Sequence, residues 1–242
     1  MEISAKTDIG LKRQTNEDTF LIAKKDDNNF IAFVCDGMGG HLGGSYASSK
    51  TVELLNEAYE DYDFEKSTKK IGVWLFETLQ KINEFVYDHS LANENLKGMG
   101  TTISGVLCIN GEIYYAHIGD SRIYTYDSKE IEQITTDHTY VNTLLMHGYI
   151  SPREALKHPK RHVLTNALGI KRDVSVDIGQ IKLHEGQNIF ICTDGVHNML
   201  NEKKLFKYLN EKISIDDKIE LIKEKALEQG GSDNLTLLIV EQ

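Results

Sequence analysis

Apolar and polar residues alternate along much of the chain, and this period of two predicts β-strands. The first three runs occupy residues 2–8, 19–23 and 30–35. A segment rich in Lys, Asp and Asn, residues 24–29, separates the second run from the third and predicts a hairpin turn. Later runs predict strands at residues 102–109, 112–117, 122–126, 131–135, 174–182, 188–193 and 235–240.

A period of three to four residues replaces the alternation in two places and predicts helices. Residues 45–60 and 66–90 form the first pair, and residues 201–210 and 216–229 form the second. Strands, two helices, many strands, two helices and a last strand are typical of an α+β layer architecture. We therefore expect helices packed outside a mostly antiparallel sheet system.

The segment before the strand predicted at 174–182 has a different composition. Residues 138–170 are mostly polar, include Pro152 and Pro159, and carry few apolar anchors for their length. This pattern predicts a surface flap that contains two short helical pieces.

Composition limits the classes of protein to consider. The chain has 242 residues and only two prolines, with no linker-like segment, so we expect one domain over residues 1–242. No run of apolar residues is long enough to span a membrane, and residues 1–8 lack the apolar core of a signal peptide. Three cysteines without C-x-x-C spacing favour a reducing cytoplasm. A net charge of −10 argues against nucleic acid as a partner.

The most informative stretch is residues 30–44. A strand-like run ends in Asp36-Gly37, a glycine-rich loop follows, and a helical pattern begins near Ser45. A carboxylate held there offers the oxygen ligand that Mg²⁺ and Mn²⁺ prefer. The same order of strand, Asp-Gly and helix recurs at Asp194-Gly195, so a simple hairpin turn does not explain it.

Further carboxylates stand at other predicted strand ends. Asp120 and Asp233 lie among small residues, and the pair Glu17-Asp18 precedes a strand. Carboxylates gathered without partners repel one another unless cations neutralise them, so the pattern predicts a site for several metal ions. A turn role remains an alternative for Asp120, and Asn234 is expected to orient Asp233 by a hydrogen bond.

Two other side chains extend the candidate site. Arg13 precedes Glu17 by four residues, and its planar fork is suited to binding a phosphoryl group, although a solvated loop charge is the alternative. His41 lies in the glycine-rich loop, where it could protonate a leaving group or cap the following helix.

The ordered motifs closely resemble the bacterial branch of the metal-dependent serine/threonine protein phosphatases, the type-2C or PPM family. The resemblance covers essentially the whole chain, and many matches in order are more specific than any single motif. They are Thr7-Asp8-Ile9-Gly10, Arg13-Gln14-Thr15-Asn16-Glu17-Asp18, Val34-Cys35-Asp36-Gly37-Met38-Gly39-Gly40-His41, Gly100-Thr101-Thr102, Gly119-Asp120-Ser121-Arg122, Thr136-Asp137-His138, Asn166-Ala167-Leu168-Gly169, Thr193-Asp194-Gly195 and Gly231-Ser232-Asp233-Asn234-Leu235-Thr236.

The resemblance implies a central sandwich of two antiparallel sheets flanked by helix pairs, in four layers α-β-β-α, with a flap over about residues 139–170. It also implies two Mn²⁺ or Mg²⁺ ions, with a third, weaker cation in bacterial members. Asp36 would bridge the two ions, the Gly37 carbonyl would bind one, and Asp194 with Asp233 would hold the other.

The remaining roles follow from the same resemblance. Glu17 and Asp18 would bind metal directly or through water, Asp120 with Asp194 would hold the third cation, and Arg13 would bind the substrate phosphate. His41 is only a displaced candidate for the general acid, because some family members carry that histidine where this chain has Met38. A role for His162 in the flap is left open.

Such a centre implies a mechanism. Two cations about 3.5–4 Å apart share a water and lower its pKa from about 15.7 toward neutrality, and the hydroxide then attacks phosphorus in line. The expected substrates are phosphoserine and phosphothreonine in proteins, and the enzyme, expected to be a monomer, would oppose a bacterial serine/threonine kinase.

Three alternatives remain. A degenerate phosphatase would keep the fold and serve as a binding module, although the full set of carboxylates argues against it. A dinucleotide loop at residues 37–43 would bring Asp36 against a pyrophosphate and lacks the later acidic residue of such sites. Within the family, a phosphatase specific for one regulatory partner, such as an anti-sigma antagonist, is the third.

Overall fold

The computed structural model describes residues 1–40, 42–64 and 70–242. The candidate His41 lies outside the described residues, as do residues 66–69 of the second predicted helix.

The first sheet joins the two ends of the chain. Its strands run in the order β1 (Glu2–Asp8), β11 (Leu235–Glu241), β10 (Asn188–Cys192), β7 (Arg122–Tyr126) and β8 (Ile131–Gln133). Every neighbouring pair is antiparallel. The first strand, at one edge of this sheet, is therefore hydrogen-bonded to the last strand, although the two are farthest apart in sequence.

The strands of the second sheet come from residues between 18 and 181. Its order is β2 (Asp18–Asp26), β3 (Asn29–Met38), β5 (Ile103–Ile109), β6 (Glu112–Ile118) and β9 (Asp177–Ile181), with the short β4 (Gly100–Thr101) also on β3. The predicted hairpin at Asn110-Gly111 is confirmed, because both residues have the positive φ angles, 53° and 82°, of the tight turns that these residues favour.

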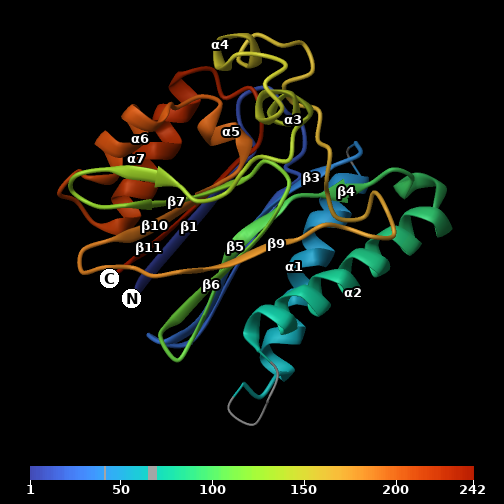
Figure 1. Cartoon of the computed structure of the whole chain (residues 1–242), viewed down its shortest axis with the longest axis horizontal. Coiled ribbons are helices and arrows are strands. Elements are labelled where there is room, and N and C mark those ends of the chain that lie inside the picture. The colour runs from blue at the N-terminus through green and yellow to red at the C-terminus, as the bar shows by residue number, and fades with distance from the viewer. Residues whose placement is uncertain (41, 65–69) are drawn as a thin grey trace.

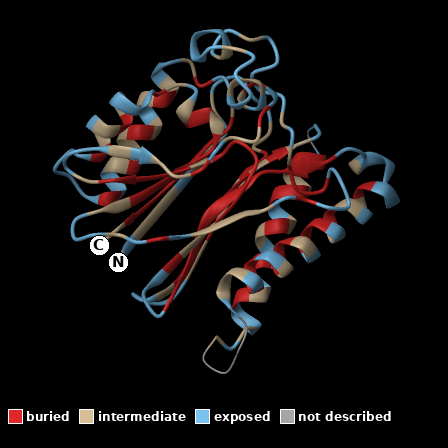
Figure 2. Ribbon diagram, viewed as in Figure 1, coloured by how far each residue is buried: buried red, intermediate tan, exposed pale blue. Residues whose placement is uncertain are grey.

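The two sheets pack face to face. Phe30, Val34 and Val106 of the second sheet share one fully buried cluster with Ile191 and Leu238 of the first. Burial of large aliphatic and aromatic side chains is the main favourable term that holds such a sandwich together. Figure 2 shows this buried band running along the strands between the layers.

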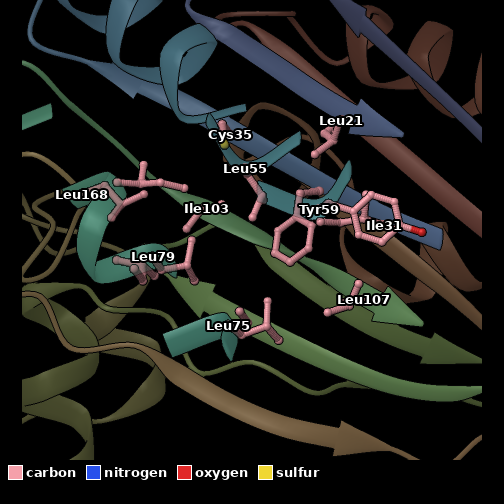
Figure 3. Packing of buried hydrophobic residues seen from close by; sticks show 14 of the residues in the cluster. Leu21, Ile31, Cys35, Leu55, Tyr59, Leu75, Leu79, Ile103, Leu107 and Leu168 are labelled. Carbon is pink, nitrogen blue, oxygen red and sulfur yellow. The ribbon is translucent and has the colours of Figure 1, made fainter. Parts of the chain in front are cut away.

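Each outer face of the sandwich is covered by helices. Helices α1 (Gly43–Asp61) and α2 (Ile71–Ala92) lie on the second sheet, followed by a 3-10 turn at Glu94–Leu96 (Figure 1). Figure 3 shows Leu55 of α1 and Leu75 and Leu79 of α2 turned toward side chains of the strands. Helices α6 (Glu202–Leu209) and α7 (Ile215–Glu228) cover the first sheet. The predicted four-layer α+β architecture is confirmed.

The flap, residues 139–170, lies between β8 and β9 and sits over one end of the sandwich (Figure 1). It contains α3 (Tyr140–Met146) and α4 (Pro152–Ala155), the two short helical pieces that the sequence predicts. A β-bridge between Thr139 and Leu164 closes residues 139–164 of the flap into a loop. Val141 of α3 is buried, and the other side chains of α3 and α4 are exposed or partly buried.

Two details differ from the sequence-based prediction. Helix α1 begins at Gly43 rather than near Ser45, and β3 continues through Asp36 and Gly37 to Met38. The strand extends because β4 pairs with its last two residues, Gly37 and Met38. Asp36 thus stands inside a strand instead of at its end. No helix in the described residues is long and apolar enough to cross a membrane.

Candidate metal centre

Two candidate carboxylates face each other across neighbouring strands. Asp18 is the first residue of β2 and lies opposite Asp36 of β3 in the antiparallel register. Residues directly opposite in such a pair have their side chains close together on one face. The strand pairing alone therefore brings two anionic groups together.

The other sheet contributes its carboxylates at the same end of the sandwich. Asp194 follows β10 as the first residue of α5 (Asp194–His197), and Asp233 stands two residues before β11. Because β10 and β11 are antiparallel neighbours, with Cys192 opposite Leu237, the end of one meets the start of the other. Asp120 lies in the turn that carries the chain from β6 of one sheet to β7 of the other.

These residues open onto one cavity of about 750 Å³ beneath the flap. Its walls include seven predicted site residues: Arg13, Glu17, Asp36, Gly37, Asp120, Asp194 and Asp233. Asp18 is buried behind them. The structure thus brings together every predicted site residue that it describes.

Asp36 is at the centre of the electrostatic crowding. Burial and then repulsion from Asp18, Asp194, Asp120 and Asp233 hold the pKa of its carboxyl well above the usual range. Removing charge from this cluster, by a proton or by a cation, therefore stabilises the fold.

Asp18 has a buried oxygen without a partner. Its Oδ2 accepts a hydrogen bond of 2.8 Å from the Thr193 hydroxyl, while Oδ1 is buried and unpaired. Burial raises the pKa of Asp18 to about 7, and the nearby Asp194 and Asp233 add to the effect. Unpaired buried polar atoms are rare because they are costly, so this oxygen fits a bound cation or a water on one.

Asp194 and Asp120 are held by residues at the C-terminal end of α5, His197 and its C-cap Asn198. Asn198 donates to Asp194 Oδ2 at 3.0 Å, and His197 Nε2 lies 2.9 Å from the Asp120 carbonyl oxygen. Burial and repulsion from Asp233 raise the pKa of Asp194 to about 6. His162 of the flap brings its Nδ1 to 4.0 Å from Asp194 Oδ2, so the flap reaches the carboxylate cluster.

In both Asp-Gly pairs, close packing against another backbone segment requires a glycine. A Cβ on Gly37 would stand 2.2 Å from the Gly44 carbonyl oxygen, and one on Gly195 would stand 1.9 Å from that of Asn234. Neither glycine has a positive φ, so close approach of backbone segments is what excludes a side chain. The glycines allow segments that carry different carboxylates to touch.

Arg13 reaches the cluster through Asp233. Its Nη2 donates to Asp233 Oδ2 at 2.7 Å, and the arginine side chain is half exposed to the cavity. The predicted partner of Arg13 was a substrate phosphate and that of Asp233 a metal ion. Both assignments require this ion pair to open, which exchange with a bound phosphate would allow.

Asn234 acts differently from the prediction. Its side-chain oxygen accepts from the Glu17 backbone N–H at 2.9 Å, and its amide donates to the carbonyls of Ile9 and Thr15, each at 2.9 Å. Only its backbone N–H bonds to Asp233. The side chain therefore holds the loop that carries Arg13 and Glu17.

Several supporting residues were missed as such. Asp137 accepts hydrogen bonds from Arg122 Nε and Nη2 at 2.9 and 2.7 Å, which fixes the start of β7 next to Asp120. His138 exchanges hydrogen bonds with Gly119, through its backbone N–H and through ring Nδ1. Asp137 and His138 belong to a motif that the sequence shows. Their hydrogen-bond partners lie 15 and 19 residues away in sequence, and no local pattern indicates such a pairing.

The cavity fits hard cations but is not closed around one. Among the described residues, no group of three or more His, Cys, Asp or Glu side chains is already gathered as metal ligands. The carboxylates line one cavity, and Asp233 is paired there with Arg13. Side chains therefore have to turn for a cation to bind.

The geometry agrees with comparisons to known proteins. The family model described as protein phosphatase 2C matches residues 11–228. The serine/threonine phosphatase stp of Listeria monocytogenes serotype 4b is 34% identical over 242 residues, covering 100% of this chain and 96% of that protein. A putative protein phosphatase 2C-type of Streptococcus pyogenes serotype M6 is 39% identical, covering 99% of this chain and 97% of that protein.

Solved structures give the same answer for the fold. The structure of the S. agalactiae serine/threonine phosphatase matches with a TM-score of 0.93 at 33% identity, covering 99% of this chain and 98% of that chain. The Stp1 phosphatase of Staphylococcus aureus matches with a TM-score of 0.91 at 31% identity, covering 100% of this chain and 94% of that chain. This chain belongs to the protein phosphatase 2C family and is a serine/threonine protein phosphatase.

Proposed function

We propose that the enzyme hydrolyses phosphoserine and phosphothreonine in proteins with two Mn²⁺ or Mg²⁺ ions. The observation that carries this proposal is the crowding of Asp18, Asp36, Asp120, Asp194 and Asp233 around one cavity. Carboxylate oxygens whose pKa values are raised by burial and by one another are the donor set that hard divalent cations prefer.

Distinct residues would hold the ions. Asp36 and the Gly37 carbonyl would bind the first, Asp36 with Asp194 and Asp233 the second, and Asp120 with Asp194 a third and weaker one. Glu17 and Asp18 would act directly or through water, and the unpaired Asp18 Oδ1 supports this role. When bound, the ions supply the Lewis acidity that activates a water for in-line attack on phosphorus.

The chain's own side chains prepare the substrate. Arg13 would leave Asp233 for the phosphoryl oxygens, where its paired N–H groups orient the group and neutralise its charge. No cysteine is needed, because all three are buried and burial raises the pKa of the Cys35, Cys108 and Cys192 thiols, which keeps them protonated. His41, as a candidate general acid, stays a sequence-based prediction.

The cellular role follows from the same activity. The substrates would be phosphoproteins of a serine/threonine kinase pathway in a bacterial cytoplasm, and residues 1–242 would act as one monomeric domain that includes the flap. A member specific for one regulatory partner would differ only in substrate choice.

Hydrolysis of a phosphothreonine peptide by the purified protein tests the proposal. Release of phosphate should require millimolar Mn²⁺ or Mg²⁺, and EDTA should abolish it and excess metal restore it. Binding of the peptide without turnover under any metal condition would favour the degenerate binding module instead.

A further inference from the structure

The flap carries a charge opposite to that of the rest of the protein. Residues 139–170 contain four basic side chains, Arg153, Lys157, Lys160 and Arg161, and a single acidic one, Glu154. The flap is therefore positive by three charges in a chain whose net charge is −10. Such a local reversal of sign attracts anionic partners to one place on an acidic protein.

These basic side chains are exposed and are not used for internal ion pairs. All four are exposed, and no ion pair joins any of them to another residue in the part of the chain that the structure describes. The one acidic residue of the flap is already engaged, because Glu154 accepts from the Ser151 backbone N–H and hydroxyl at 2.8 and 2.7 Å. Lys160 lies over the Tyr140 ring, with Nζ 5.2 Å from its centre.

The segment that carries the charges is ordered by its own turns. The backbone N–H of Lys157 donates to Glu154, that of His158 to Ala155, and that of Arg161 to His158, at 3.1 to 3.2 Å. The Lys160 N–H donates to His158 Nδ1 at 3.1 Å. A partner that binds here pays little to order the backbone, which favours recognition.

The charged segment begins at the edge of the catalytic cavity. Arg161 and His162 line both the 750 Å³ cavity and a neighbouring cavity of about 200 Å³ between the flap and α5. A peptide whose phosphoresidue occupies the first cavity therefore has a continuous path to the flap. Lys160, Lys157 and Arg153 extend the positive charge away from that edge.

We propose that Arg153, Lys157, Lys160 and Arg161 form a docking surface for acidic residues that flank the phosphoresidue of the substrate. This inference, which rests on the proposed function, defines the preferred substrates as phosphoproteins with Asp, Glu or a second phosphate near the cleaved group. A nucleic acid is the less suitable ligand, because four charges on an acidic protein do not make the extended basic track that a phosphate backbone needs.

Two phosphothreonine peptides of equal length test this proposal. One carries Asp and Glu around the phosphothreonine, and the other carries Asn and Gln at the same positions. With Mn²⁺ present, the wild type should have about tenfold higher kcat/KM for the acidic peptide at low salt. The preference should decrease strongly in about 0.5 M salt, since exposed charges are screened.

Charge reversal locates the effect on the flap. The double variant Lys157→Glu/Lys160→Glu should lose most of the preference, and Lys157→Gln/Lys160→Gln should lose part of it. The matched control Lys203→Glu/Lys212→Glu makes the same change in net charge at exposed positions of the α6 region and should keep the preference. Fluorescence anisotropy of the labelled acidic peptide, in an Asp36→Asn background, should give the same order of affinities without turnover.

The outcomes separate the two proposals. If the wild type hydrolyses neither peptide, the proposed function fails. If it hydrolyses both equally well, or if the flap variants keep the preference, the docking surface is refuted while the phosphatase mechanism stands. A short single-stranded RNA could instead compete more strongly than the acidic peptide, with the competition lost in the flap variants. That result would also refute the docking surface, in favour of a nucleic-acid surface.

Discussion

Asn234 accepts the backbone N–H of Glu17 through its side-chain oxygen at 2.9 Å, across a sequence separation of 217 residues. The same amide group donates to two carbonyls of the loop before Glu17, and the asparagine is buried. One side chain thus satisfies three backbone groups and fixes the loop that carries Arg13 at the edge of the catalytic cavity.

The substitution Asn234→Ala should therefore destabilise the protein by roughly 2–4 kcal/mol, because buried backbone groups lose their partners. Urea unfolding in EDTA measures this loss, and isothermal calorimetry should show weaker Mn²⁺ binding. Asn210→Ala is the matched control, since that exposed amide makes one bond to a helix carbonyl. Equal stability of the two variants would contradict the role of Asn234.

Neutralising a central carboxylate should separate activity from folding. Asp36→Asn or Asp194→Asn should lower kcat at least ~100-fold, because each carboxylate is expected to hold a catalytic cation. The metal-free variants should be at least as stable as the wild type, since the change relieves repulsion within the cluster. Added Mn²⁺ should raise the Tm of the wild type and not that of Asp36→Asn. Near wild-type turnover by either variant would refute the assignment.

The pH dependence of stability provides a separate test on Asp18. Its pKa rises to about 7 in the folded protein, from 3.8 as the ordinary value. Between these values the folded state holds a proton that the unfolded state lacks, so this group's contribution to the free energy of unfolding falls as pH rises. Relative to the wild type in EDTA, Asp18→Asn should gain stability from about pH 4 to 7.

The free energy of unfolding has to be compared between the wild type and Asp18→Asn at each pH. Burial lowers the pKa of His117 to about 4 and that of His197 to about 3, and these two groups make stability rise with pH instead. The difference between wild type and variant cancels their effect. Because the Asp18 charge also raises the pKa of Asp36, the difference profile reports the titration of Asp18 together with its effect on that neighbour. A flat difference profile would mean that Asp18 is ionised throughout.

Glycine substitutions test the close backbone contacts at the site. Gly195→Ala should cost about 2–4 kcal/mol of stability and most of the activity, because its Cβ would collide with the Asn234 carbonyl. Gly72→Ala, in the first turn of α2, meets only Ile178 at 3.5 Å and should be neutral or stabilising by up to about 1 kcal/mol. Differential scanning calorimetry of both variants decides whether packing is the reason for glycine.

The elements that the sequence predicted well are those with a local signal. Period-two runs marked the strands, and the Asn110-Gly111 turn marked its hairpin, because both patterns depend on neighbouring residues. The extension of β3 through Asp36 was not predictable, since it depends on pairing with β4 more than 60 residues later.

The candidate site divides in the same way. Its carboxylates were identifiable because each follows or precedes an apolar run among small residues. The contacts that position them were not, because Asn234 reaches Glu17, and Asp137 reaches Arg122, only after folding. Which carboxylates face each other depends on strand register, as for Asp18 and Asp36. The register cannot be derived from amino-acid composition.

The pairing of β1 with β11 has a consequence for the timing of activity in the cell. Among the strands that the structure describes, a ribosome makes β1 first and β11 last, so β1 has no partner strand until the strands between them have been made. Asp233 and Asn234 emerge with that final strand. A chain without β11 also lacks Asp233, so under the proposed assignment it cannot complete the ligand set of the second cation.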